Sequence, residues 1–298
     1  MFIIGAGISG LLAARMLWHK EPIILEKQPS LPNNHSAVLR FRSDVVANVT
    51  GIEFKKVQVI KGSLRWRNPI ADALSYAEKN TGKLRSDRSL PTSVSTVERY
   101  IAPPDFIAQI ASGLEHKINF GADAHSYLWK ESSTFISTIP MPDLMRMLDY
   151  PNIPDFQVVS GTNMIATVSR CDAYVSLYVP NPFYHFSRVS LTGDELIVEF
   201  PHEETNPEMI YAAAGLVGIA RDRLSDVTIK PQKYAKIQPI DERTRKTFIA
   251  YATDKYNIYS LGRYACWRPS LLLDDLVKDI RLIERWMNDG AYAMRKQR

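Results

Sequence analysis

Short apolar runs and a helical repeat alternate at the start of the chain. Residues 2–4 are apolar, residues 11–17 carry apolar side chains at helical spacing, and residues 22–25 are apolar again. Strands buried on both faces of a parallel sheet read as continuous apolar runs, whereas a covering helix repeats every three to four residues. The pattern therefore predicts a β-α-β unit over residues 1–27.

Similar patterns extend this unit through residue 150. The further strands expected are residues 57–60, 118–120 and 134–140, and the further helices are residues 70–77, residues 106–114 and a segment around 144–148. Alternating strand and helix patterns are typical of a doubly wound α/β domain. We expect residues 1–150 to form the first part of such a domain.

The pattern changes between residues 151 and 250, where apolar and polar residues alternate. This alternation is typical of antiparallel strands that have one face in water. It is clearest at residues 174–179, 188–191 and 195–200, and a helix is expected near residues 207–222. We interpret this stretch as a lobe of mainly antiparallel strands.

The last part of the chain returns to the first pattern. Residues 256–261 form an apolar strand, and the next helix carries an apolar stripe from Leu272 to Met287. Residues 251–298 are therefore expected to complete the first domain. The predicted fold class is α/β: a Rossmann-like domain, residues 1–150 and 251–298, with an inserted substrate lobe at residues 151–250.

A glycine-rich turn joins the first strand to the first helix. Gly5, Gly7 and Gly10 have G-x-G-x-x-G spacing, and the second strand ends on Glu26. In dinucleotide-binding folds these glycines allow a tight turn, approach of the backbone to a pyrophosphate and close packing of the helix. The acid then binds the ribose hydroxyls, and the helix N-terminus stabilises the phosphate charge. We expect Ile8, Ser9 and Lys27 to lie at the same ligand.

The loop after Glu26 leaves the sheet at the edge where such folds bind their ligands. We therefore place His35, Ser36 and Arg40 near the cofactor as well. No spacing typical of metal ligands occurs, and Cys171 and Cys266 stand far apart, so we expect no metal site and no disulfide.

Composition changes the picture mainly through charge. The 298-residue chain has a formal net charge of +5, with arginines and lysines in several clusters. A basic surface favours a polyanionic partner such as nucleic acid, but a solvated basic face and arginines that hold cofactor phosphates explain it equally well. No apolar stretch has the length of a membrane helix, and no signal peptide is recognisable. We expect a cytoplasmic protein, and the sequence leaves its oligomeric state open.

Three segments resemble the two-lobed flavoproteins that include amine oxidases, protoporphyrinogen oxidase and UDP-galactopyranose mutase. They are residues 5–27, residues 136–142, and Leu261-Gly262-Arg263 with the helix that follows. The resemblance implies FAD as cofactor. It also implies that Gly262 and Arg263 contact its diphosphate, and that the helix beginning near Leu272 directs its N-terminus at the flavin.

A second, fainter resemblance links residues 35–42 to small phage flavoproteins of thymidine hypermodification. It implies a DNA-borne amine substrate, in which oxidation of an amino-acid adduct on the base leads to its breakdown. It also implies that a phage-encoded protein of this kind acts in the host cytoplasm. A small-molecule amine substrate is the other expectation.

The candidates for contact with the substrate are His35, Tyr184, His185, Arg188 and Trp267. Aromatic side chains desolvate an amine and favour its neutral form, and arginine binds carboxylate or phosphate. The leading functional hypothesis is an FAD-dependent oxidoreductase of amine-oxidase type, with hydride transfer from a C–H next to nitrogen. The alternatives are a mutase-like enzyme that uses reduced flavin without net oxidation, and a non-catalytic nucleotide- or DNA-binding module.

Overall fold

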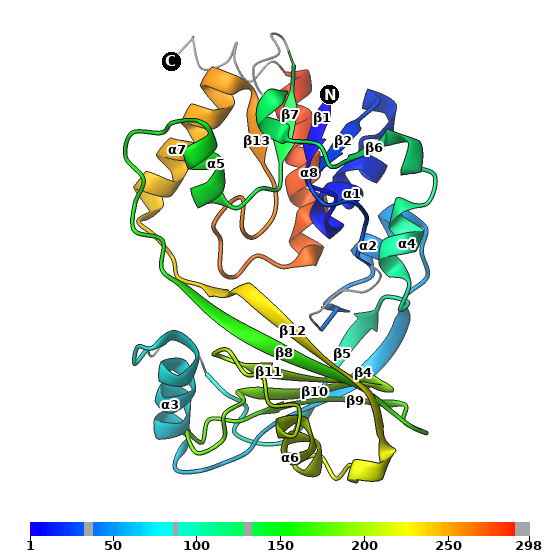
Figure 1. Ribbon diagram of the computed structural model, residues 1–298, viewed down its shortest axis with the longest axis vertical. Helices are drawn as coiled ribbons and strands as arrows, with labels where there is room; N and C mark the ends of the chain where they lie inside the picture. The colour runs from blue at the N-terminus through cyan, green and yellow to red at the C-terminus, as the bar shows by residue number, and fades with distance from the viewer. Residues whose placement is uncertain (33–37, 86–88, 128–132, 290–298) are drawn as a thin grey trace.

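Two sheets stacked along the long axis organise the molecule (Figure 1). The computed structural model describes residues 1–32, 38–85, 89–127 and 133–289. Sheet A has the order β13-β7-β1-β2-β6, and every neighbouring pair is parallel. Its strands are β1 (Phe2–Ile4), β2 (Ile23–Glu26), β6 (Ile118–Phe120), β7 (Phe135–Ser137) and β13 (Ile258–Ser260).

Helices cover both faces of sheet A because its strands are apolar on both sides. Ile3 belongs to the buried cluster that packs against one layer, whereas the next residue, Ile4, belongs to the cluster on the opposite face. The first layer contains α1 (Ile8–Met16), α2 (Val45–Thr50), α4 (Phe106–Ala111) and α8 (Leu273–Asn288), and the second contains α5 (Met141–Met147) and α7 (Glu242–Tyr256). No helix among the described residues is long and apolar enough to cross a membrane.

Sheet B lies below sheet A and has eight strands in the order β12-β8-β11-β10-β9-β4-β5-β3. Neighbouring strands in this sheet are antiparallel, except that β4 and β9 pair in parallel. The strands are β3 (Arg40–Phe41), β4 (Lys55–Ser63), β5 (Ser95–Ile101), β8 (Val158–Val168), β9 (Ala173–Tyr178), β10 (Arg188–Gly193), β11 (Glu195–Phe200) and β12 (Leu224–Ile237).

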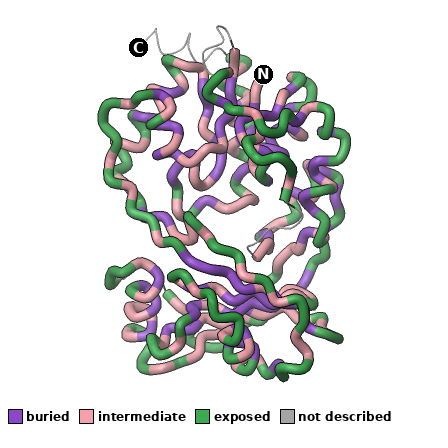
Figure 2. The backbone as a smooth tube through the Cα atoms, viewed as in Figure 1, coloured by how far each residue is buried: buried purple, intermediate pink, exposed green. Residues whose placement is uncertain are grey.

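Two helices, α3 (Pro69–Thr81) and α6 (Met209–Gly215), lie on the side of sheet B away from sheet A (Figure 1). Ile210 and Ala213 of α6 are fully buried against apolar residues of the central strands. Figure 2 shows that buried residues gather in these central strands and around sheet A. The opposite face of sheet B is therefore directed toward the parallel domain.

The predicted fold class is confirmed, with one change in how the chain is shared between the sheets. Strands β3, β4 and β5 come from residues 40–101, yet they pair within sheet B. The boundary expected at residue 150 is therefore not the division between the two sheets. The sequence did not show this because a strand's length and apolar content do not reveal which sheet it joins.

Among the described residues, two helices (α2 and α7) and four strands (β3, β5, β8 and β12) were not predicted from the sequence. β12 is an edge strand, where charged residues and a proline such as Pro231 are tolerated because one side of its backbone is unpaired. α7 buries only Phe248 and Ala252 fully, so its apolar stripe is narrow. Asp241, whose carboxylate accepts a hydrogen bond from Thr244 N at 2.7 Å, is the cap signal that marks its start.

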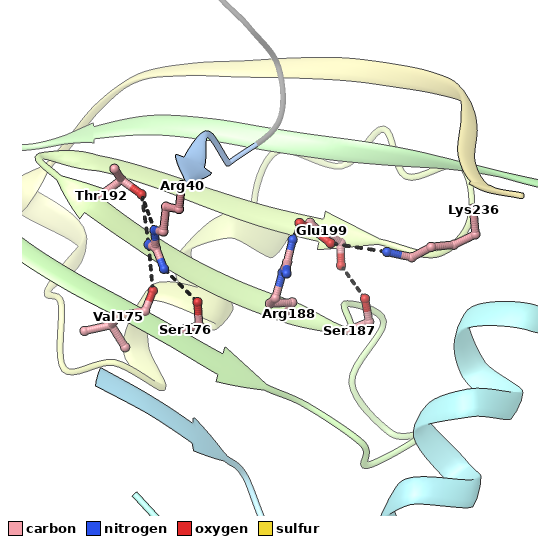
Figure 3. Close-up of polar contacts among 8 residues, drawn as sticks. All are labelled: Arg40, Val175, Ser176, Ser187, Arg188, Thr192, Glu199 and Lys236. Atoms are coloured by element: carbon pink, nitrogen blue, oxygen red, sulfur yellow. Dashed lines mark hydrogen bonds and ion pairs between the residues drawn. The ribbon is translucent and has the colours of Figure 1, made fainter. Parts of the chain in front are cut away.

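Arg40 fastens strand β3 to the middle of sheet B (Figure 3). Its guanidinium donates hydrogen bonds to Ser176 Oγ at 2.7 Å, Thr192 Oγ1 at 2.8 Å and Val175 O at 2.9 Å, and a further one to Leu191 O. Burial, and then the nearby Arg188 charge, lower the pKa of Arg40 to about 10. The guanidinium contacts sheet B through every nitrogen, so Arg40 stabilises the strand arrangement.

We predict that Arg40→Met lowers the free energy of unfolding by about 2–4 kcal/mol, because several partners of a charged donor lose their hydrogen bonds. Urea unfolding followed by circular dichroism measures this change. Arg42→Met is the matched control, since the Arg42 side chain is exposed and two residues away. Equal loss of stability in the two variants would contradict a special role for Arg40.

Candidate functional site

The glycine turn (residues 5–10) is held so closely that two of its glycines have no room for a side chain. Gly5 has φ +97°, and a Cβ atom there would lie 2.2 Å from Thr138 Oγ1. A Cβ at Gly10 would lie 1.9 Å from the carbonyl oxygen of Gly5. Helix α1 therefore begins in direct backbone contact with the end of β1.

Gly7 differs from its two neighbours because a Cβ there would meet nothing within 4 Å. Its φ of −70° and ψ of 175° are open to any residue. Neither packing nor backbone conformation requires a glycine at this position. Space beside the backbone, directly in front of the N-terminus of α1, is what a bound phosphate group requires.

Glu26 reaches from the end of β2 to the turn. One carboxylate oxygen accepts a hydrogen bond from Ala6 N at 2.7 Å, and the other accepts one from Gln28 N at 2.8 Å. A carboxylate oxygen has two acceptor positions, so each retains one for a hydroxyl group. The acid is thus oriented beside the turn, as a ribose-binding carboxylate needs to be.

The C-terminal segment meets the turn at Gly262, directly after β13. Gly262 has φ +98°, and a Cβ there would lie 2.9 Å from Ser9 Oγ. The next residues are fixed by Tyr264 O, which accepts from Met141 N at 3.0 Å, and by Tyr264 Oη, which donates to Tyr234 O at 2.9 Å. Residues far apart in the sequence therefore form one edge of sheet A.

Helix α8 begins at this edge as well. Leu272 is its N-cap residue and donates its backbone N–H to the Asp275 carboxylate at 2.9 Å. Asp274 accepts hydrogen bonds from the backbone N–H groups of Arg42 and Ser43, both at 2.9 Å. The start of α8 is thereby joined to the segment that follows β3.

A cavity of about 140 Å³ lies between sheet B and the segment after β13. The charged side chains that line it are Arg188, Glu199, Lys236 and Arg263, and the aromatic ones are Phe200, Tyr234 and Tyr264. Arg188 and Glu199 face each other across β10 and β11 and form an ion pair, and Lys236 lies 3.6 Å from the same carboxylate (Figure 3). Three cationic groups and one carboxylate give the lining a positive charge.

Two arginines that line the cavity each have a buried N–H donor without a hydrogen-bond partner in the described part of the chain. Among the described residues, the buried Nε atoms of Arg188 and Arg263 have no hydrogen-bond partner. A buried donor without a partner costs about 1–3 kcal/mol, which a bound acceptor recovers. An anionic group in the cavity would meet this requirement.

Charge pairing decides the protonation of Glu199. Burial alone would raise its pKa, but Arg188 and then Lys236 outweigh burial and lower the pKa to about 2. Burial alone would lower the pKa of Arg188, but the Glu199 carboxylate outweighs it and raises that pKa. Both groups are therefore charged throughout the physiological range.

The structure brings most of the expected cofactor residues to one place. Gly5, Gly7, Ile8, Ser9, Gly10, Glu26 and Lys27 lie at the turn and the end of β2, and Gly262, Arg263 and Leu272 approach from the other end of the chain. Arg40 instead bonds to sheet B. His35 and Ser36 lie outside the described residues.

The expected substrate contacts are dispersed. Arg188 lines the cavity, whereas Trp267 is 1% exposed and donates Nε1–H to Gln238 O at 2.8 Å, so it packs inside the protein. Tyr184 packs on Phe186 with ring centroids 5.4 Å apart. His185 is exposed and lies beside His202 and Glu204.

Sequence reasoning missed Thr138, Glu199 and Lys236. Thr138 packs on Gly5 and donates to Ile4 O at 2.7 Å. Glu199 and Lys236 meet through strand pairing and the fold of β12, so neither is recognisable by spacing. The one signal for Glu199 is a carboxylate inside the apolar strand β11, since buried charges require a partner.

No protein-family model matches the sequence, and no curated protein matches it at the sequence level. Solved structures do match the fold. Reduced UDP-galactopyranose mutase superposes with a TM-score of 0.69 at 15% identity, over 96% of this chain and 95% of that one. A fatty acid isomerase from P. acnes that produces CLA gives a TM-score of 0.58 at 12% identity, over 96% and 98%.

A third structure, a geranylgeranyl bacteriochlorophyll reductase-like protein from Thermoplasma acidophilum, gives a TM-score of 0.53 at 9% identity, over 98% of this chain and 79% of that one. These likenesses extend over both lobes, and UDP-galactopyranose mutase is a member of the group that the sequence resembles. The chain therefore has the two-lobed fold of these structures, with a Rossmann-like lobe. This part of the sequence-based prediction is confirmed.

We predict that Glu199 stabilises the fold above about pH 5 and loses this effect as the pH falls toward 2. Its pKa is lower in the folded chain than the ordinary 4.5, so protonation disfavours folding. The difference in unfolding free energy between the wild type and Glu199→Gln should therefore narrow between pH 6 and pH 3, as measured by urea unfolding.

Glu195→Gln is the control on the same strand. Burial raises the pKa of Glu195, so its carboxylate destabilises the fold at neutral pH and this effect disappears in acid. The two variants should change in opposite directions with pH. A parallel change would contradict the assignment of Glu199 as a paired carboxylate.

Proposed function

We propose that the chain is an FAD-dependent oxidoreductase that oxidises a substrate carrying both an amine and an anionic group. The proposal rests mainly on one observation: Gly7 leaves open space at the N-terminus of α1, whereas Gly5 and Gly10 are filled by their surroundings. Packing explains Gly5 and Gly10, whereas the open space at Gly7, at the N-terminus of a helix, leaves room for a ligand. The two-lobed fold favours FAD as that ligand.

The residues present fit this cofactor. The glycine turn and Gly262 offer backbone on both sides of a diphosphate, Glu26 offers acceptors to a ribose, and Arg263 offers a cationic donor. Helix α8 offers a positive dipole end beside Leu272 to the flavin. When bound, FAD supplies the two-electron acceptor for a hydride from a C–H next to nitrogen.

The positive cavity supports an anionic substrate. Arg188 and Lys236 bind and orient a carboxylate or phosphate, and Glu199 keeps Arg188 in position. Tyr234 and Tyr264 exclude water on one side, which favours the neutral form of an amine. Within this class we propose an amino-acid-modified thymidine in phage DNA, with breakdown of the adduct as the outcome. The basic clusters of the chain, with its net charge of +5, support this substrate.

A second candidate is a mutase-like enzyme that uses reduced flavin without net oxidation. The likeness to reduced UDP-galactopyranose mutase favours it, since that structure matches nearly the whole chain. The anion-binding cavity suits such a substrate equally well. The two candidates differ in whether turnover reduces the flavin.

We predict that Gly7→Ala folds normally but loses FAD. The added methyl group meets no protein atom within 4 Å and requires no backbone change, so the unfolding free energy should stay within about 0.5 kcal/mol of the wild type. The methyl group blocks approach of the diphosphate, so the affinity for FAD should fall at least tenfold, measured by flavin fluorescence on reconstitution.

Gly215→Ala, which also adds a methyl group in open space, is the control and should retain FAD. Wild-type protein that takes up no FAD would exclude the proposal. Equal affinity of wild type and Gly7→Ala would show that the open space at the turn is not the diphosphate site.

We predict that an oligonucleotide with glycine linked through its nitrogen to a thymine methyl carbon bleaches the visible flavin absorbance under anaerobic conditions. The Lys236→Met variant should need more of this substrate for the same rate, because one cation of the cavity is lost. The unmodified oligonucleotide is the control. Turnover that begins only after chemical reduction would instead favour the mutase-like enzyme, and no bleaching by any amine would favour a binding module without chemistry.

A further inference from the structure

Two histidines and a glutamate converge on the surface of sheet B, outside the cavity described above. His185 belongs to the turn that leads into β10, and His202 and Glu204 follow the end of β11. Their side chains are 60%, 46% and 12% exposed, so the glutamate lies beneath the two imidazoles. Among the described residues, no other three groups of this kind meet as closely.

Strand pairing sets the position of the two histidines. Arg188 pairs with Glu199, and Ser187 N donates to Glu199 O at 2.8 Å. Continuing this pairing beyond the ends of β10 and β11 places His185 opposite His202. The two imidazole centroids lie 5.8 Å apart.

Glu204 is held in place by its own backbone and by its neighbours. Its N–H donates to Thr162 Oγ1 of strand β8 at 3.0 Å, and Thr162 is buried. Its Oε1 accepts hydrogen bonds from the backbone N–H groups of Thr205 and Asn206, both at 3.0 Å. The remaining oxygen, Oε2, is therefore directed at the histidines before any ligand binds. Fixing of a ligating carboxylate by hydrogen bonds is typical of metal sites.

The distances suit a single metal ion. Glu204 Oε2 lies 3.5 Å from His185 Nδ1 and 3.9 Å from His202 Nε2, and all three ligand atoms lie within 4.8 Å of one another. Ligands about 2.0–2.1 Å from a tetrahedral zinc ion are separated by about 3.3 Å. The three atoms need only small side-chain rotations to reach this spacing, and the exposed histidines are free to make them.

We propose that His185 Nδ1, His202 Nε2 and Glu204 Oε2 bind one divalent transition-metal ion of the zinc type. Two imidazoles and one carboxylate favour such an ion over Mg²⁺ or Ca²⁺, which prefer oxygen ligands. The exposed side leaves the other coordination positions to water. The ion joins the turn before β10 to the segment after β11. The expectation of no metal site is thereby revised, because strand pairing, invisible in the spacing, brings these residues together.

Equilibrium dialysis of the full chain against Zn²⁺, with metal content measured by mass spectrometry, tests the proposal. We expect one ion per chain that is absent or at least tenfold more weakly bound in His185→Ala and in Glu204→Gln. His19→Ala is the matched control: His19 Nε2 lies 3.0 Å from Glu284 but belongs to no such three-residue group. It should retain the ion, and Mg²⁺ at the same concentration should not compete.

Co²⁺ provides a second measurement that does not depend on activity. The visible absorption of bound Co²⁺ should show imidazole and carboxylate ligation in the wild type and should be lost in His185→Ala. The His185 side chain is exposed, so this variant should fold normally, which circular dichroism checks. Equal zinc affinity in wild type, His185→Ala and Glu204→Gln would overturn the proposal, as would no zinc binding by the wild type. FAD content should not differ among the variants.

Discussion

The structure depends on how closely the backbone of α1 approaches the end of β1. A single methyl group at Gly10 would lie 1.9 Å from the Gly5 carbonyl oxygen, and one at Gly262 would lie 2.9 Å from Ser9 Oγ. These contacts set the start of α1, and through Gly262 they bring the C-terminal segment to the same edge of sheet A. The cavity depends on this approach as well, because Arg263 and Tyr264 follow directly after Gly262.

The glycine turn and the cavity attract negative charge in different ways. At the glycine turn, negative charge is matched by backbone N–H groups and a helix dipole, without a required cationic side chain. At the cavity, Arg188, Lys236 and Arg263 supply full charges, and Glu199 balances only part of them. Negative charge is therefore attracted by the backbone at the turn and by charged side chains at the cavity.

Local pattern was sufficient to predict the strands of sheet A and insufficient to predict which strands form sheet B. The glycine turn, the acid at the end of β2 and the stripe of α8 are short-range features, and each lies where the sequence predicted it. Arg40 was expected near the cofactor on the basis of its loop, but its bonds to Ser176 and Thr192 depend on which strands become neighbours. Glu199 and Lys236 were missed because they also meet only through the pairing of strands distant in the sequence. Trp267 was interpreted as a substrate contact, but its side chain is buried and its indole N–H donates a hydrogen bond to Gln238 O.

The parallel pairing of β4 with β9 joins two portions of sheet B, although these two strands lie more than a hundred residues apart in the chain. Residues 40–101 supply one portion and residues 158–237 the other, while strands β6 and β7 of sheet A lie between them in the sequence. Neither lobe can therefore be excised as a continuous fragment. Because non-local pairing slows folding, the protein is expected to fold slowly and to acquire both lobes together, late in the process. A truncation anywhere between these portions would remove strands from both sheets.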